Sequence, residues 1–383
     1  MKKVLLGTTA MVGASVLMAG TALASDPPTL SLSGYMKFEA WFADQDATGG
    51  TAGDANRGYH FEVDDAEIHF KAQATADNGL KYGVKVELDV DANSTIDEAV
   101  INLEGNWGIV YLGDEDGAED LMKVGGFSVL TAGGGWDGGP TAILQNPGSV
   151  NLLGPTLGFA SGIADSIGDS DDATKISYFT PSFSGFGLGI SWTPDTGHSM
   201  GGAISDAADS GHVENLLEWG AEYKGTIAND FNIHVSARGL WGSPEGETDG
   251  DAAGREDIMS WGLGGKVEYQ GFGLAAGYGD NGDSGINTTA KNAGRDAGIW
   301  YDVALSYKNG PYTVAGGYFH SEEDRTATTK DEVDFFSIGG KYNVAPGLDV
   351  YAEYDYVEID DGAGTTTAVD NDASLFMIGT QIT

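Results

Sequence analysis

The sequence predicts an all-β fold, a 16-stranded antiparallel transmembrane β-barrel with a long third loop folded inward. Three observations predict it. Short segments of alternating apolar and polar residues recur along the chain, and their connections alternate between short and long. After the N-terminal segment no run of about 18 apolar residues follows, which excludes helical membrane spans. The chain has 60 glycines and no cysteine, so barrel closure rather than disulfides would hold the strands together.

The first 24 residues read as a signal peptide. Residues 1–3 are basic at positions 2 and 3, residues 4–19 are largely apolar, and Ala22-Leu23-Ala24 has the A-x-A form of a cleavage site. A membrane anchor is the alternative, but the apolar stretch is too short and too rich in glycine and serine to span a bilayer. We therefore expect Sec export, cleavage near Ala24, and a single β-barrel domain over residues 25–383.

Strand periodicity is clearest in residues 80–91. Successive side chains of a strand point to opposite faces, so the even positions here form an apolar wall and most odd positions a charged one. In a membrane barrel the apolar wall would face lipid and the charged wall a wet lumen. About sixteen such segments are expected, with fourteen or eighteen as alternatives: 29–43, 59–75, 79–91, 96–104, 107–113, 173–181, 184–193, 213–226, 229–241, 256–270, 271–279, 296–308, 310–321, 331–344, 346–358 and 372–382.

The connections predict two different ends of the barrel. Short connections such as 76–79, 182–185 and 345–347 contain glycine, proline or asparagine and fit tight periplasmic turns. Long ones, rich in Gly, Asp, Ser and Thr, fit external loops; they are expected at 44–58, 194–212, 242–255, 280–295, 322–330 and 359–371. A soluble sandwich would show no such one-sided asymmetry.

The connection at about 114–172 is unusually long, and a connection of this length is usually functional. We interpret it as a constriction loop inside the barrel, with an external lid or partner-binding loop as the alternative. It opens with five carboxylates in seven residues, and a further acid lies within the glycine-rich run 133–139. The candidate acids of the constriction are Asp114, Glu115, Asp116, Glu119, Asp120 and Asp137.

Charge balance excludes one class of partner and favours another. The chain has 58 acidic against 19 basic residues, a formal net charge of −39. Nucleic-acid binding needs a basic surface, so no nucleic-acid partner is expected. The same acidic excess would attract cations to a wet lumen. Acidity that only keeps an exported protein soluble is the alternative.

Several segments together resemble the general, non-specific porins of the Gram-negative outer membrane, the alphaproteobacterial type most of all. They are GIVYLGDEDGA at 108–118, AEIHF at 66–70 with ATADNGL at 74–80, and KISYFTPSFSGFGLGISWTPD at 175–195. The resemblance covers essentially the whole mature chain. It implies a homotrimer in contact with outer-membrane lipids and lipopolysaccharide, and a third loop facing a basic cluster on the wall. Two features depart from the family: the chain ends in Gln381-Ile382-Thr383 rather than an aromatic residue, and it has only five arginines.

These observations predict a passive channel for small hydrophilic solutes and ions, with cations preferred. Loop carboxylates and wall cations would set up a transverse field across a wet constriction, which selects ions without binding them tightly. No cofactor is required for this. The wall cations expected to face the lumen, from their strand parity, are Lys37, Lys71, Lys81, Lys85 and Arg238.

A divalent-cation site in the long loops is a second hypothesis. Asp249, Asp251, Asp280 and Asp283 supply the oxygen ligands that Ca²⁺ or Mg²⁺ takes. No complete Ca²⁺-binding loop pattern is present.

Three rival functions remain from other classes. An enzyme is not expected, because the sequence contains neither G-x-S-x-G nor H-E-x-x-H. Gly133-x-Gly135-x-x-Gly138 matches the dinucleotide-binding motif G-x-G-x-x-G, but it follows no adjacent strand and opens no helix. A substrate-specific channel would need a lumenal aromatic ladder, for which Tyr35, Trp41 and Trp300 are too few. A plugged or adhesin-like structural barrel is the remaining alternative.

Overall fold

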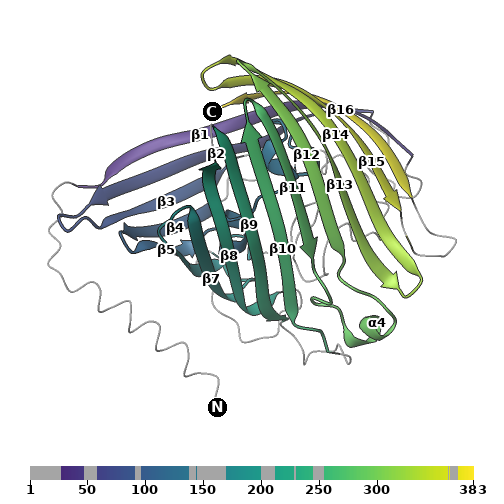
Figure 1. Ribbon diagram of the computed structural model, residues 1–383, viewed down its shortest axis with the longest axis horizontal. Helices are drawn as coiled ribbons and strands as arrows, with labels where there is room; N and C mark the ends of the chain where they lie inside the picture. The colour runs from purple at the N-terminus through teal and green to yellow at the C-terminus, as the bar shows by residue number, and fades with distance from the viewer. Residues whose placement is uncertain are drawn as a thin grey trace.

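The computed structural model describes residues 27–46, 58–90, 96–137, 144, 170–199, 212–227, 230–244, 254–360, 362 and 370–383. The predicted signal peptide lies outside these residues. Sixteen strands form one closed barrel in which each pairs with its neighbours in sequence, and β16 closes the ring on β1 (Figure 1). All the pairings are antiparallel, so the predicted barrel is confirmed.

The strand bounds follow the predicted segments within a few residues in most cases. They are β1 Thr29–Gln45, β2 Tyr59–Thr75, β3 Lys81–Asp89, β4 Ile96–Gly105, β5 Gly108–Asp114, β6 Thr174–Phe179, β7 Phe186–Asp195, β8 Val213–Ile227, β9 Phe231–Pro244, β10 Ile258–Tyr269, β11 Phe272–Asp280, β12 Ile299–Asn309, β13 Tyr312–Thr326, β14 Thr329–Ala345, β15 Leu348–Asp360 and β16 Asn371–Ile382.

One predicted loop is wrong. Residues 322–330 were expected to form a long connection, but β13 and β14 continue through most of them and pair as far as Thr326 with Thr329. Both faces of this part of the hairpin carry polar residues, so the alternation that marks a strand within the bilayer is missing from the sequence there.

Alternation along each strand separates an outer from an inner face. On β12, Leu305 is 55% exposed and Tyr301 40% exposed, whereas Trp300 is fully buried and Asp302 nearly so. The exposed apolar row faces outward, where lipid would cover it, and the intervening residues face the lumen. The same parity defines inward and outward residues on the other strands.

Tight turns close one end of the barrel. Ser184-Gly185 and Gln270-Gly271 both have two successive positive φ angles, as a two-residue type I′ hairpin turn requires. The other end carries the long connections, one of which contains the short helix α4 (Thr288–Asn292). Because short turns are periplasmic in bacterial outer-membrane barrels, the turn end is the periplasmic end.

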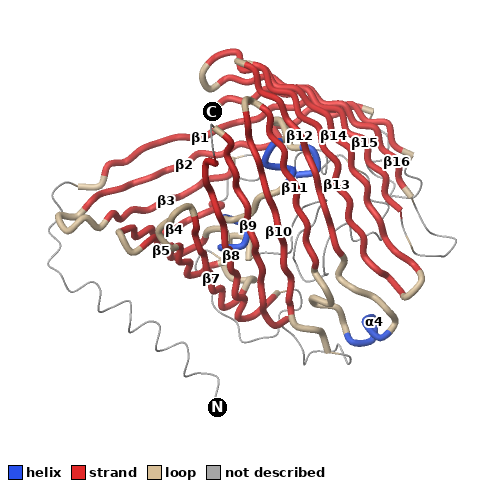
Figure 2. The backbone as a smooth tube through the Cα atoms, in the orientation of Figure 1, coloured by secondary structure: helices blue, strands red, loops and turns tan. Residues whose placement is uncertain are grey.

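The described start of the third loop lies against the inner wall. It contains α2 (Ala118–Leu121), η1 (Gly126–Val129) and η2 (Gly135–Asp137), and Figure 2 shows short helical stretches in blue among the strands. α2 contacts β6 to β9, η1 contacts β11 to β13, and η2 contacts β14. No helix among the described residues is long and apolar enough to cross a membrane.

Candidate pore constriction

Three inward carboxylates hold the third loop by accepting backbone N–H groups. Asp302 on β12 accepts from Gly126 at 2.7 Å, and Glu353 on β15 accepts from Gly135 at 2.9 Å. Glu218 on β8 accepts from Ser170 at 3.1 Å, near the end of the same connection. All three carboxylates are buried. A buried carboxylate needs such donors, so each bond fixes the loop at a defined height on the wall.

An ion pair joins the loop helix to the wall. Arg238 Nη1 on β9 lies 2.6 Å from Glu119 Oε1 on α2, and both side chains are only 1% exposed. The Arg238 guanidinium also lies over the ring of Trp300, 5.6 Å from its centroid. Glu119 therefore lies between loop and wall, not at the water-filled edge of the loop.

A small aromatic core forms inside the barrel. Trp136 from the loop is fully buried and stacks on Phe319 with ring centroids 5.9 Å apart. Phe335 packs against Trp136 in a T-shaped arrangement. Trp300 also stacks on Phe319. Aromatic pairs of this kind stabilise beyond their buried area by about 0.5–1.5 kcal/mol each. The loop is thus anchored by apolar packing as well as by carboxylates.

Inward glycines on the wall make room for the loop. A Cβ atom at Gly317 would lie 2.6 Å from the Trp136 ring, and one at Gly220 would lie 2.7 Å from Met122 Sδ. A Cβ at Gly264 would overlap the carbonyl oxygen of Val124. Contacts this short are not found for real Cβ atoms. Only glycine at these wall positions therefore lets the loop approach the wall so closely.

The opposite part of the lumen holds an acidic group around one lysine. Lys85 Nζ on β3 lies 2.7 Å from Glu115 Oε2 and also contacts Glu98 on β4. Lys175 on β6 donates to the backbone oxygens of Glu115 and Asp171. The start and the end of the third loop are therefore tied together at its base.

Asp172, just before β6, belongs to this acidic group. Burial, and then the nearby carboxylates of Asp171 and Asp97, raise the pKa of Asp172 to about 8. Carboxylate oxygens of Asp116, Asp171 and Asp172 lie within 4.8 Å of one another, as do those of Glu98, Glu115 and Asp116. These groups concentrate negative charge at the base of the loop.

The structure places the six predicted loop acids in different surroundings. Asp114 ends β5 and accepts from the Thr174 hydroxyl, and Asp120 pairs with Lys123 at 3.2 Å. Glu115 contacts Lys85 and Glu119 contacts Arg238, while Asp116 lies in the acidic group. Asp137 ends η2, and its side chain lies outside the described part of the structure.

The five predicted wall cations do not form one cluster. Lys85 and Arg238 touch loop acids directly, whereas the expected transverse field would have separated these charges by water. Lys37 pairs with Asp65 at 3.2 Å, and Lys81 pairs with Glu104 at 2.7 Å beside a short turn. Lys71 is exposed and lies opposite Lys85 in the register of β2 and β3.

The predicted metal ligands are not brought together by the described residues. Asp249 and Asp251 lie outside them. Asp280 Oδ1 accepts the backbone N–H of Gly282 at 2.9 Å, and Asp283 pairs with Lys291 at 2.9 Å. Within the described part of the chain, the groups of three or more possible ligands include neither Asp280 nor Asp283.

Sequence reasoning missed the residues that dock the loop. Asp302, Glu353 and Glu218 have inward parity, but parity alone does not say which inward residues meet the loop. Their signal is that each is a carboxylate at mid-strand and inward, where a partner is required. Trp136 gave a weaker signal as the one large aromatic in a glycine-rich run.

A closed sixteen-stranded barrel whose lumen is narrowed by its own third loop defines a bacterial outer-membrane channel protein. Residues 7–362 match the sequence model described as Gram-negative porin, and the chain belongs to this family. It is therefore an outer-membrane porin, as the resemblance in the sequence implied.

Relatives match nearly the whole chain, and solved structures share its barrel fold. Uncharacterised proteins of Rickettsia conorii and Rickettsia typhi are 23% and 24% identical, each over 94% of this chain and 93% of the relative. The anion-selective porin from Comamonas acidovorans has a TM-score of 0.62 at 15% identity, covering 92% of this chain and 99% of that one. Vibrio cholerae OmpT, in its trimer form, has a TM-score of 0.61 at 15% identity, with coverages of 93% and 99%. At these identities the structural likeness shows the fold alone.

Proposed function

We propose that this porin is a passive, cation-preferring diffusion channel for small hydrophilic solutes and ions. The acidic group at the base of the third loop carries the proposal. There, Lys85 and Lys175 face a larger number of carboxylates, including Glu98, Glu115 and Asp172. A surplus of fixed negative charge at a narrow, wet passage raises the local concentration of cations.

The anion-selective Comamonas porin does not argue against this proposal. A shared barrel does not carry selectivity with it, because selectivity depends on the charges that line the lumen. In the present chain the wall cations Lys85 and Arg238 are each neutralised by direct contact with a carboxylate of the loop. Such contact pairs contribute little to the net electric field in the lumen. The remaining acids therefore determine whether cations or anions are preferred.

The wider setting of the channel is proposed on the same basis. The chain would be exported by the Sec pathway, cleaved near Ala24, and inserted among outer-membrane lipids and lipopolysaccharide as a homotrimer. Support comes from the signal-like N-terminus and from the trimer form of the Vibrio cholerae neighbour. Passive diffusion needs neither catalysis nor a cofactor.

Removing charge from the acidic group tests the proposal. At pH 9, above the pKa of about 8 of Asp172, the double variant Asp116→Asn/Asp172→Asn should lower the preference for K⁺ over Cl⁻ measured as zero-current potential across a planar bilayer. The matched control, Asp77→Asn/Asp230→Asn, removes the same charge from two periplasmic turns and should change the potential less. Equal potentials for the wild type and the first variant, both folded, would refute the assignment of selectivity to this group.

The rival reading is a plugged or adhesin-like barrel, favoured by the extensive docking of residues 115–137 on the inner wall. A folded barrel that conducts no current would support it. A substrate-specific channel would instead show saturable block by one solute.

A further inference from the structure

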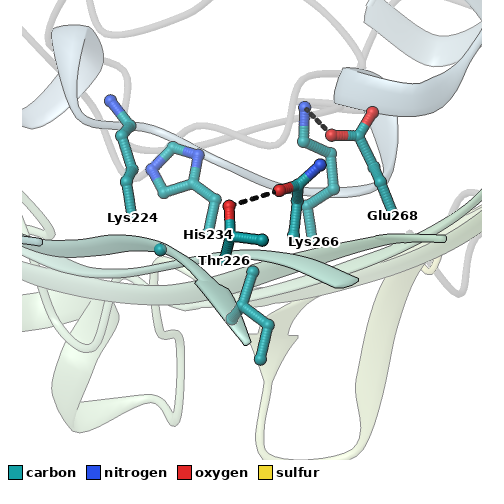
Figure 3. A pocket seen from close by; sticks show the side chains of 8 residues that line it. Lys224, Thr226, His234, Lys266 and Glu268 are labelled. Atoms are coloured by element: carbon teal, nitrogen blue, oxygen red, sulfur yellow. Dashed lines mark hydrogen bonds and ion pairs between the residues drawn. The ribbon is translucent and has the colours of Figure 1, made fainter. Parts of the chain in front are cut away.

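A pocket lies on the inner wall near the periplasmic end, well away from the acidic group. It has a volume of about 450 Å³ and is formed by three adjacent strands. β8 supplies Lys224 and Thr226, β9 supplies Asn232 and His234, and β10 supplies Lys266 and Glu268 (Figure 3). We call this set the three-strand pocket.

The strand register arranges these six side chains in two rows. Lys224 pairs with His234, which in turn pairs with Lys266. Thr226, Asn232 and Glu268 form the next row toward the turns. Neighbouring strands are about 4.8 Å apart, so His234 stands between Lys224 and Lys266 in the register. The Nε2 atom of His234 lies 3.1 Å from Glu222 Oε2.

All six side chains face the lumen. Odd-numbered residues of the same strands, such as Val235 on β9 and Leu263 on β10, are exposed on the outer face, and parity places the even-numbered pocket residues on the opposite side. Lipid headgroups outside the barrel therefore do not reach the pocket, whereas a solute in the periplasmic mouth does.

The donors of the pocket exceed what the local carboxylates use. Lys224 contacts Glu222 at 2.8 Å but is still 57% exposed. Lys266 is 3.9 Å from Glu268, at the limit of an ion pair, and Glu268 is itself 51% exposed. Each ammonium has three donors and accepts none. The Thr226 hydroxyl contacts Asn232 Oδ1 at 2.7 Å, so the amide nitrogen of Asn232 keeps its donors.

Further lysines surround this mouth. Lys308 on β12 and Lys341 on β14 also have inward parity and lie close to short turns. Lys341 pairs with Asp349 at 3.3 Å. An arc of lysines at one end of a strongly acidic chain gives this mouth a local potential unlike that of the loop.

We propose that the three-strand pocket is a binding site for a small dianion of the phosphate type, entered from the periplasmic side. The remaining donors of Lys224, Lys266 and Asn232, which surround His234, match the peripheral oxygens of such an anion, and charge-assisted hydrogen bonds would hold it. This goes beyond the proposed cation preference and does not depend on its sign, because the pocket and the acidic group lie at different levels of the barrel.

His234 provides a direct test, since it is the pocket's histidine among six in the chain. Purified full-length protein with labelled histidine is titrated with inorganic phosphate at fixed pH and ionic strength, and the imidazole signals are followed by NMR. The His234 signals should shift saturably, while those of His69 and His320, which belong to β2 and β13, should not.

Two variants separate specific binding from diffuse attraction. Lys224→Gln/Lys266→Gln should weaken phosphate binding by about tenfold or more, because each lysine contributes a charge-assisted hydrogen bond. Lys308→Gln/Lys341→Gln removes the same charge from the arc outside the pocket and should leave the affinity within about twofold. Lys224→Arg/Lys266→Arg, which keeps the charge, should retain binding.

Three results would overturn the proposal. They are an unshifted His234, equal weakening in both glutamine variants, and a shift in wild type that chloride reproduces at the same ionic strength. Heat-modifiable migration on a gel verifies that each variant is a folded barrel. Zero-current potential, measured on the same preparations, tests the cation preference separately, so failure of one does not mimic failure of the other.

Discussion

Arg238 Nη1 on the wall lies 2.6 Å from Glu119 Oε1 on the loop helix, and neither side chain is exposed to more than 1%. The pair joins α2 to β9 in surroundings from which water is excluded. It thereby fixes α2 to the wall. Removing one partner leaves an uncompensated buried charge.

Glu119→Gln should destabilise the folded barrel by about 3–5 kcal/mol, the usual cost of breaking a buried ion pair from one side. Urea unfolding in lipid vesicles measures this. Glu119→Gln/Arg238→Gln removes both charges and should recover most of the loss. An undiminished loss in the double variant would mean that the charge pairing is not what holds α2.

Gly264→Ala should reduce single-channel conductance. The new methyl group would overlap the Val124 carbonyl and push the loop toward the centre of the lumen. Gly265→Ala is the matched control, because its Cβ would meet only ordinary contacts, the nearest being Val235 Cγ1 at 3.4 Å. Equal conductance of the two variants would contradict the close approach of loop and wall.

Trp136→Ala should release the η2 end of the loop. Loss of a buried tryptophan costs about 3–5 kcal/mol, and here the cost falls on loop docking rather than on the strand ladder. Open-channel current noise should increase, and proteolysis within the loop should become faster. Trp107→Ala, at an exposed short turn, should change neither quantity.

Cation preference should increase as pH rises through the range in which Asp172 ionises. The pKa of Asp172 is raised from 3.8 to about 8, so near neutral pH the Asp172 carboxyl is largely protonated. Zero-current potential measured from pH 5 to pH 9 should therefore increase with pH, and Asp172→Asn should remove part of that increase. Asp77→Asn, in an exposed turn, should leave the pH response as in wild type.

Asp172 also makes the unfolding free energy of the barrel depend on pH. Folded Asp172 holds its proton to higher pH than the unfolded chain does, so the folded state binds more protons between pH 3.8 and about 8. The contribution of Asp172 to the unfolding free energy therefore falls as pH rises through that window. Asp172→Asn should make the unfolding free energy less dependent on pH between these limits, which urea unfolding at several pH values measures.

The barrel was predictable because strand parity is a local property. Residues 80–91 show their two faces without knowledge of any other segment, and glycine in turns such as Gln270-Gly271 marks where strands end. The hairpin at Thr326 was not predictable, because beyond the bilayer both of its faces are polar. Strand assignment from alternation fails where water, rather than lipid on one side, contacts both faces of the strand.

The constriction was only partly predictable. The acidic start of the loop and the parity of Lys85 and Arg238 identified residues that meet, but not that they meet in direct contact. Docking depends on which wall residue lies opposite which loop residue, as with Asp302 and Gly126. That relation is set by the path of the loop across several strands, which no local pattern encodes.

The most direct test of the channel account is the zero-current membrane potential of the purified wild-type protein in a planar bilayer under a KCl gradient. The account predicts stepwise conductance and a potential whose sign shows that K⁺ crosses more readily than Cl⁻. A potential of the opposite sign would contradict the proposed cation preference, and a folded barrel without conductance would contradict the open channel itself.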